Sequence, residues 1–279
     1  MSDLVRNVSD TARWVATYRA KESTRKDALF RDPLAEQLAG ERGRAIAKVA
    51  SKHSEWALIT RTKVIDDLVA DLVAESYDVV LNLAAGFDTR PYRLELPPDL
   101  LWVEADLPAL LREKEQLIGS EKARCKLESV AVDLADPVAR RAFLEHYAAL
   151  GKRVAVISEG LVIYLDERVV TDLARDLLAY PTIKSWILDF NSPRINAESM
   201  RSMAATLSNA PFKFAPPNGV GFFEALGWRG RDVRSLFHAG ARMKRLPLWM
   251  RPFALLPGPD PRDLKNERWS AVVRLERPS

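Results

Sequence analysis

The hydrophobic positions of the first 76 residues have the spacing of helices, and no strand pattern interrupts them. In the stretch 54–76, apolar residues recur every three or four positions, namely Leu58, Val64, Ile65, Leu68, Leu72 and Val73. This spacing predicts an amphipathic helix of about six turns. Apolar residues between 12 and 18 predict a second helix, and in the segment between the two, Asp32 before Pro33 predicts a helix start and Gly40 a helix stop.

From residue 78 onwards the pattern changes to short apolar runs separated by helical stretches. The runs predict strands at 78–83, 100–106, 127–134, 153–159, 183–190 and 269–276, and helices are predicted at 108–118, 137–150, 167–179 and 194–208. Strands that alternate with helices predict an α/β fold, a parallel sheet with helices on both faces. Near the C-terminus, 231–244 has a helix-like pattern, and the five prolines of 246–263 predict a loop without regular structure.

Composition narrows the functional classes. The 279 residues are 47% hydrophobic and 29% charged, which is typical of one large or two small globular domains. With Cys125 as the single cysteine and three histidines, neither a disulfide nor a zinc site is expected, and no other metal is predicted. No signal peptide or membrane-spanning stretch is recognisable, so a cytoplasmic protein without a membrane partner is expected.

The net charge of +4 does not by itself indicate nucleic-acid binding. The run 228–251 holds seven Lys or Arg residues against one Asp. Such a run is more often a solvated basic face, or a lid that attracts an anionic substrate, than an RNA site. No nucleic-acid partner is therefore expected.

Small and acidic residues follow the predicted strands at the positions where an open parallel sheet binds its ligand. Ala84, Ala85 and Gly86 follow the first strand, Glu104 and Asp106 end the second, Asp133 ends the third and Glu159 ends the fourth. Small residues let a ligand approach the backbone, the acid of the second strand can bind ribose hydroxyls, and that of the third can accept a bond from an adenine amine. The pattern predicts an adenosine-binding crevice.

The turn after the first strand favours one kind of adenosine compound. Its sequence LAAGFDTRP lacks the glycine spacing of a dinucleotide site, and Asp88 would repel a pyrophosphate. The positively charged, phosphate-free S-adenosyl-L-methionine suits such a turn better. Arg61, on the helix before the first strand, is the candidate partner for its carboxylate.

Four ordered segments, NLAAGFDTRPYRL, WVEADLP, VAVDL and ISEGLVIYL, resemble the leucine carboxyl methyltransferase-like group of S-adenosylmethionine-dependent O-methyltransferases. The N-terminal segment is similar to the bacterial natural-product branch of this group, and the resemblance covers about residues 10–190. It implies a class I methyltransferase fold with a mostly parallel seven-stranded sheet. A helical cap over residues 1–76 and a cofactor-binding domain over 77–279 are expected.

The resemblance also implies roles for individual residues. Arg61 matches the carboxylate-binding arginine, Ala84 and Gly86 the glycines of the first turn, Asp106 the ribose-binding acid, Asp133 with Leu134 the adenine-recognition pair, and Glu159 the acid after the fourth strand. Ala84 departs from the family, because the eukaryotic members have glycine there. Its methyl group narrows the approach to the methionine end of the cofactor.

The reaction implied is an in-line displacement at the cofactor's methyl group by an oxygen of a small molecule, expected to be a secondary metabolite. A carboxylate acceptor is ionised near neutral pH and needs no general base, whereas a phenolic acceptor needs one, with His53 and Glu159 as candidates. Tyr18, Arg19 and Tyr164 are the expected substrate contacts. Asp66 and Asp67 are interpreted as solvent-exposed helix residues.

Three other functions stay open. Methylation of a protein C-terminal carboxylate is the alternative within the class. An NAD-dependent oxidoreductase and an RNA-binding module that uses 228–251 are less favoured, and the sequence leaves the oligomeric state undetermined.

Overall fold

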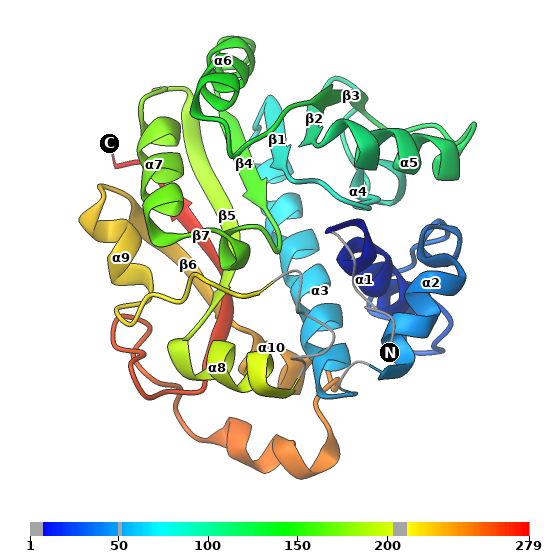
Figure 1. The fold of residues 1–279 in the computed structure, drawn as a ribbon, viewed down its shortest axis with the longest axis vertical. Helices are drawn as coiled ribbons and strands as arrows, with labels where there is room; N and C mark the ends of the chain where they lie inside the picture. The colour runs from blue at the N-terminus through cyan, green and yellow to red at the C-terminus, as the bar shows by residue number, and fades with distance from the viewer. Residues whose placement is uncertain (1–7, 50–51, 203–210, 279) are drawn as a thin grey trace.

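The computed structural model describes residues 8–49, 52–202 and 211–278, and its centre is a seven-stranded sheet (Figure 1). The strands are β1 (Val79–Leu83), β2 (Leu101–Asp106), β3 (Lys126–Ala131), β4 (Val154–Ser158), β5 (Ile183–Asn191), β6 (Arg229–Ser235) and β7 (Ser270–Glu276). Their order is β3-β2-β1-β4-β5-β7-β6; β3, β2, β1, β4 and β5 pair in parallel, and β7 runs antiparallel to both β5 and β6. The predicted mostly parallel seven-stranded sheet is confirmed.

Helices cover both faces of this sheet because its central strands are apolar on both sides. On one face, Val79, Leu81 and Leu83 of β1 pack in a cluster with α6 (Pro137–Ala148), α7 (Glu167–Leu178) and α9 (Val220–Ala225). On the other face, Val80 of the same strand packs with α3 (Lys52–Ala74) and α10 (Leu236–Arg242). Alternate residues of one strand thus enter opposite core layers.

The N-terminal helices pack beside this layered core. α1 (Val8–Ser23) and α2 (Ala35–Val49) lie side by side (Figure 1). α2 also contacts α5 (Pro108–Ile118), and Leu38 of α2, Leu34 just before it, and Leu110 and Ile118 of α5 belong to one apolar cluster. The remaining elements are α4 (Arg90–Arg93), α8 (Pro193–Ser202) and the 3₁₀ helices η1 (Val162–Tyr164) and η2 (Leu248–Leu255). Because α3 also covers the sheet, the boundary between a cap and a cofactor domain at residue 76 stays a prediction.

Three local predictions are wrong. The stretch 231–244 is not one helix, because its first half pairs with β7 as the edge strand β6. Gly40 does not end α2, and the helix continues beyond it after a kink. The proline-rich segment also contains a regular element, the eight-residue 3₁₀ helix η2, with Pro252 inside it. No helix in the described ranges is both long and apolar enough to cross a bilayer.

Candidate active site

The strand order reverses between β1 and β4, and the carboxyl ends of the strands there open into a cavity of about 1190 Å³. Such a reversal separates neighbouring loops and leaves room for a ligand. Nine of the ten predicted site residues line the cavity: Arg19, Arg61, Ala84, Gly86, Asp106, Asp133, Leu134, Glu159 and Tyr164. Tyr18 lies outside its wall, buried in a cluster with Trp14, Phe30, Ile46 and Ile59.

The turn after β1 is held against the end of β2 by Asp106. Its carboxylate accepts hydrogen bonds from the backbone N–H groups of Gly86 and Leu107, both at 2.7 Å. Burial raises the pKa of Asp106 above its ordinary value, although both backbone donors oppose that shift. The turn has a left-handed backbone at two positions, with φ 54° at Ala84 and φ 52° at Gly86. Glycine adopts this conformation freely, whereas at Ala84 it costs about 1–2 kcal/mol.

Asp133 and Leu134 form the rim of the cavity beyond β3. Asp133 is exposed, and its Oδ1 accepts a hydrogen bond from the backbone N–H of Ala135 at 2.9 Å. The bond folds the loop so that both residues border the cavity, next to Val132 and Ala135. Their role as an adenine-recognition pair stays a prediction.

Glu159 lies between two arginines. It accepts from Arg61 Nε at 2.9 Å and pairs with Arg90 Nη1 at 2.8 Å. Burial alone raises the pKa of Glu159, but Arg90 and Arg61 outweigh burial and hold that pKa below its ordinary value. Glu159 is therefore ionised at neutral pH and a weak base.

Arg61 has a second carboxylate partner, which the sequence analysis missed. Asp189, near the end of β5, accepts from Arg61 Nη1 at 3.0 Å and from the backbone N–H of Gly160 at 2.6 Å. Gly160 has φ 65°, and a Cβ there would lie 3.4 Å from Arg61 Nη1. The rule that picked out Glu159 at a strand end would also have found Asp189.

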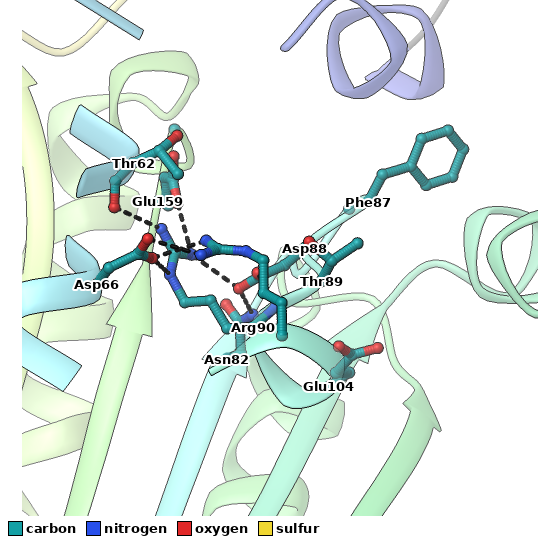
Figure 2. Close-up of polar contacts among 12 residues, drawn as sticks. Thr62, Asp66, Asn82, Phe87, Asp88, Thr89, Arg90, Glu104 and Glu159 are labelled. Carbon is teal, nitrogen blue, oxygen red and sulfur yellow. Dashed lines mark hydrogen bonds and ion pairs between the residues drawn. The ribbon is translucent and has the colours of Figure 1, made fainter. Parts of the chain in front are cut away.

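A buried network of charged groups continues from Glu159 to α3 (Figure 2). Arg90 donates from Nε to Asp66 and from Nη1 to Asp88, both at 2.8 Å, and Asn82 donates to Asp88 at 2.8 Å. Arg93 binds both oxygens of Asp66 at 2.7 Å. The interpretation of Asp66 as solvent-exposed is wrong, because Asp66 is 5% exposed.

Arg19 ties α1 to this network from the cavity wall. Its Nε donates to Asp32 at 2.8 Å and its Nη2 to the backbone oxygen of Phe87 at 2.5 Å. Asp32 also accepts from Thr89 at 2.6 Å. The helix that covers the cavity is therefore fixed to the turn after β1.

Beyond these charged groups the cavity wall is aromatic, and Tyr164 is the one ring of this wall that the sequence predicted as a substrate contact. The rings come from separate segments of the chain, namely Trp14, Trp56, Phe87, Tyr164, Phe212, Phe237, Trp249, Phe253 and Trp269. Tyr164 packs edge-on against Phe212 with ring centroids 5.4 Å apart. Burial raises the pKa of Tyr164 to about 12, so this phenol stays protonated at neutral pH. No local sequence pattern marks residues that only the fold brings together.

The described residues offer no unpaired base to the cavity. None of those that line it is a histidine, lysine or cysteine. Each lining carboxylate accepts a hydrogen bond from an arginine or a backbone N–H, as Asp88, Asp106, Asp133, Glu159, Asp189 and Glu198 do. The side chain of His53, the other base considered for a phenolic acceptor, lies outside the described part of the structure.

The sequence matches a known protein family. The profile of the family described as leucine carboxyl methyltransferase matches residues 12–177. A putative S-adenosyl-L-methionine-dependent methyltransferase of Streptomyces coelicolor is 38% identical over 176 residues, 57% of this chain and 60% of the relative, so the match spans less than two thirds of that protein. A protein with the same description from Streptomyces avermitilis is 32% identical over 239 residues, 78% of this chain and 82% of the relative.

Two solved structures share the fold. One is a duf574 family protein from Streptomyces avermitilis, with a TM-score of 0.61 and 16% identity over 96% of this chain and 97% of that one. The other is a putative methyltransferase from Thermobifida fusca, with a TM-score of 0.61 and 17% identity over 96% and 94% of the two chains. At this level of identity the likeness extends to the fold alone.

Proposed function

Because the chain belongs to the leucine carboxyl methyltransferase family, we propose that it methylates a carboxylate oxygen of a largely apolar small molecule. The predicted family, the class I methyltransferase fold and S-adenosylmethionine as cofactor are confirmed, so the chain is an S-adenosylmethionine-dependent methyltransferase. The nature of the acceptor is the proposal.

The residues present fit the cofactor. Each carboxylate oxygen of Asp106 accepts one backbone hydrogen bond and has a further lone pair for a ribose hydroxyl. Gly86 leaves the turn without a side chain, and Asp133 with Leu134 would hold the adenine. Glu159 and Arg61 offer opposite charges to the ammonium and carboxylate of the methionine part. When bound, the cofactor supplies a methyl group on a positively charged sulfur.

The single observation that favours a carboxylate acceptor is the donor set of the cavity wall: its described residues include no histidine, lysine or cysteine, and each carboxylate there already accepts a hydrogen bond from an arginine or a backbone N–H. A hydroxyl acceptor must lose its proton to a base, and Glu159 is already neutralised by two arginines. A carboxylic acid, with an ordinary pKa near 4, arrives ionised. The chain's own residues then need only to orient the acceptor and exclude water.

The cavity supports an acceptor with a large apolar body. Its volume of about 1190 Å³ exceeds the roughly 300–1,000 Å³ that usually enclose one small ligand, which leaves room for an acceptor beside the cofactor. Four of the seven tryptophans, Trp14, Trp56, Trp249 and Trp269, line it. Aromatic faces bind flat or apolar groups well, whereas a peptide backbone would need hydrogen-bond partners. A secondary metabolite therefore suits the wall better than a protein C-terminus does.

The test is methyl transfer from labelled S-adenosylmethionine to a panel of aromatic carboxylic acids, matched phenols and peptides that end in a free carboxylate. We expect label on the carboxylic acids and its release as methanol in mild alkali, which cleaves methyl esters and leaves ethers intact. Label that resists alkali would establish a hydroxyl acceptor, and label on the peptides alone would establish the protein-directed alternative.

The matched variant for this test is Asp106→Asn, read out by calorimetric titration with S-adenosylhomocysteine. Loss of a charge-assisted hydrogen bond should weaken binding by about 1.5–3 kcal/mol, or roughly 10- to 150-fold. NAD serves as the control ligand and should not bind. Equal affinity in wild type and variant would contradict the proposed ribose contact while leaving the choice of acceptor to the labelling experiment.

A further inference from the structure

An exposed apolar segment lies at the edge of the molecule, in and directly after η2. Its large side chains are Leu248, Trp249, Phe253, Leu255 and Leu256, which are 76%, 64%, 58%, 88% and 61% exposed. We call these five residues the apolar strip. Single exposed apolar residues are ordinary, but five within nine positions form a patch that indicates an interaction surface. In Figure 1 this segment belongs to the orange part of the chain at the bottom of the view, far from α6 at the top.

The sequence around the strip carries positive charge only. Between Val233 and Pro259 there are five basic residues and no acidic one. Arg234 and Arg245 are paired with acids elsewhere in the fold, whereas Arg242 at the end of α10 and Lys244 in the turn after it are exposed. The segment therefore offers apolar side chains and cations together.

Side chains hold the backbone of the strip in place through hydrogen bonds to its carbonyl oxygens and to those just before it. Arg251 donates to the backbone oxygens of Leu246 and Lys244 at 3.2 and 3.1 Å, and His238 Nε2 lies 3.1 Å from the backbone oxygen of Leu256. These bonds fix the backbone of the segment, and the side chains of Leu248, Leu255 and Leu256 stay exposed and do not line the cavity. Trp249 and Phe253 also line the large cavity, which places the strip beside it.

We propose that the apolar strip seats the protein on the surface of an anionic phospholipid bilayer. Short segments rich in Trp, Phe and Leu, flanked by Lys or Arg, insert shallowly at the level of the lipid headgroups, and each nearby cation adds attraction to anionic lipid. Tryptophan is favoured at this depth because its ring is apolar and its N–H is polar. The absence of acidic residues over 27 positions is what favours an anionic lipid surface over a second copy of the chain.

This inference does not depend on the identity of the methyl acceptor. Binding to a membrane surface would revise the expectation of no membrane partner. That expectation rested on the lack of a membrane-spanning segment, and a protein that binds only to the surface does not need such a segment. Surface binding also places the cavity beside the bilayer, where an apolar acceptor would be concentrated.

The experiment is co-sedimentation of the full chain with vesicles of phosphatidylcholine alone or mixed with phosphatidylglycerol. Wild type should sediment with the mixed vesicles, and binding should fall by at least about tenfold in Leu248→Glu/Leu255→Glu, which loses two apolar anchors and adds two negative charges. The matched control is Val138→Glu/Leu150→Glu, because these residues are 68% and 52% exposed near α6 and the charge change is the same.

Folding is checked by the thermal unfolding curve of each variant, since all four positions are exposed. A wild type that stays in the supernatant with mixed vesicles would overturn the proposal, as would equal loss of binding in the two double variants. A third outcome is that the wild type does not bind vesicles but forms a dimer, and that Leu248→Glu/Leu255→Glu makes it monomeric. The strip would then be an interface between copies of the chain. That result would also overturn the proposal.

Discussion

Asp66 shows how much one residue's role depends on what lies opposite it. In the sequence it precedes Asp67 in an amphipathic helix, and both carboxylates have the same local context. In the fold Asp66 is buried between Arg90 and Arg93, whereas Asp67 is 39% exposed and pairs with Lys63 one turn away. The two neighbours therefore differ widely in what they contribute to stability.

We expect Asp66→Ala to lower the free energy of unfolding by about 3–5 kcal/mol, because it removes one of the three carboxylate partners of buried Arg90 and leaves buried Arg93 with only a 3.9 Å contact to Asp32. Asp67→Ala, the adjacent control, should change it by about 0.5 kcal/mol or less, as for an exposed pair on a helix surface. Denaturant unfolding followed by circular dichroism measures both. Similar small effects of the two substitutions would show that Asp66 does not stabilise the arginines.

The same distinction holds for the site residues. The positions of Asp106, Asp133 and Glu159 at the cavity follow from strand ends, which a local pattern of apolar residues predicts. The ion-pair partners of Glu159 cannot be predicted in this way, because Arg61 is 98 positions away in the sequence. The contacts that set the charge of the site depend on chain segments that no local pattern connects.

At the scale of elements, α2 shows that a glycine predicted to end a helix can instead introduce a kink within it. Gly40 has φ 58° and ψ −170°, a conformation that is essentially restricted to glycine, and regular helix resumes after it. The second half of α2 is kept by packing, since Ile46 is buried against α1 and α3. Tertiary contacts thus override the stop signal.

We expect Gly40→Ala to lower the free energy of unfolding by about 1–3 kcal/mol, because alanine is strained in this conformation and its Cβ would lie 3.3 Å from Arg13. Gly221→Ala in α9 is the control, since a Cβ there meets nothing closer than 3.8 Å. It should leave stability unchanged or raise it by up to about 1 kcal/mol. Thermal melts compare the two, and an equally stable Gly40→Ala would contradict the strain.

At the scale of the whole molecule, buried carboxylates make stability depend on pH in two opposite ways. Arginines hold the pKa values of Asp32, Asp88 and Glu159 below their ordinary values against the effect of burial. The stability they contribute is present above the unfolded pKa near 4 and is lost as pH falls through the folded pKa. Burial raises the pKa values of Glu104, Asp106 and Asp189, and these groups favour folding more as pH falls toward those raised values.

We therefore expect the melting temperature to change little between pH 7 and about pH 5, where the raised set opposes destabilisation, and to fall steeply below about pH 4. Asp32→Asn should melt below wild type at pH 7, by the equivalent of about 3 kcal/mol, since it breaks the buried pair with Arg19. The difference should shrink below about pH 4, because the carboxyl of Asp32 takes up a proton in the unfolded chain while the arginines still hold its folded-state pKa lower. A difference that is constant from pH 7 to pH 3 would contradict the assigned ionisation.

The sequence by itself determined the α/β class, six of the seven strands, the acids at their carboxyl ends and the adenosine-type cofactor. These features follow from local periodicity and from the rule that parallel strands present their carboxyl ends at one edge. Only the tertiary structure decided that the polar segment at β6 is a strand, because its pairing partner β7 begins 35 residues after β6 ends. It also decided the ion pairs of Glu159 and Asp66 and the aromatic wall, since these are contacts between distant segments that only the folded chain brings together.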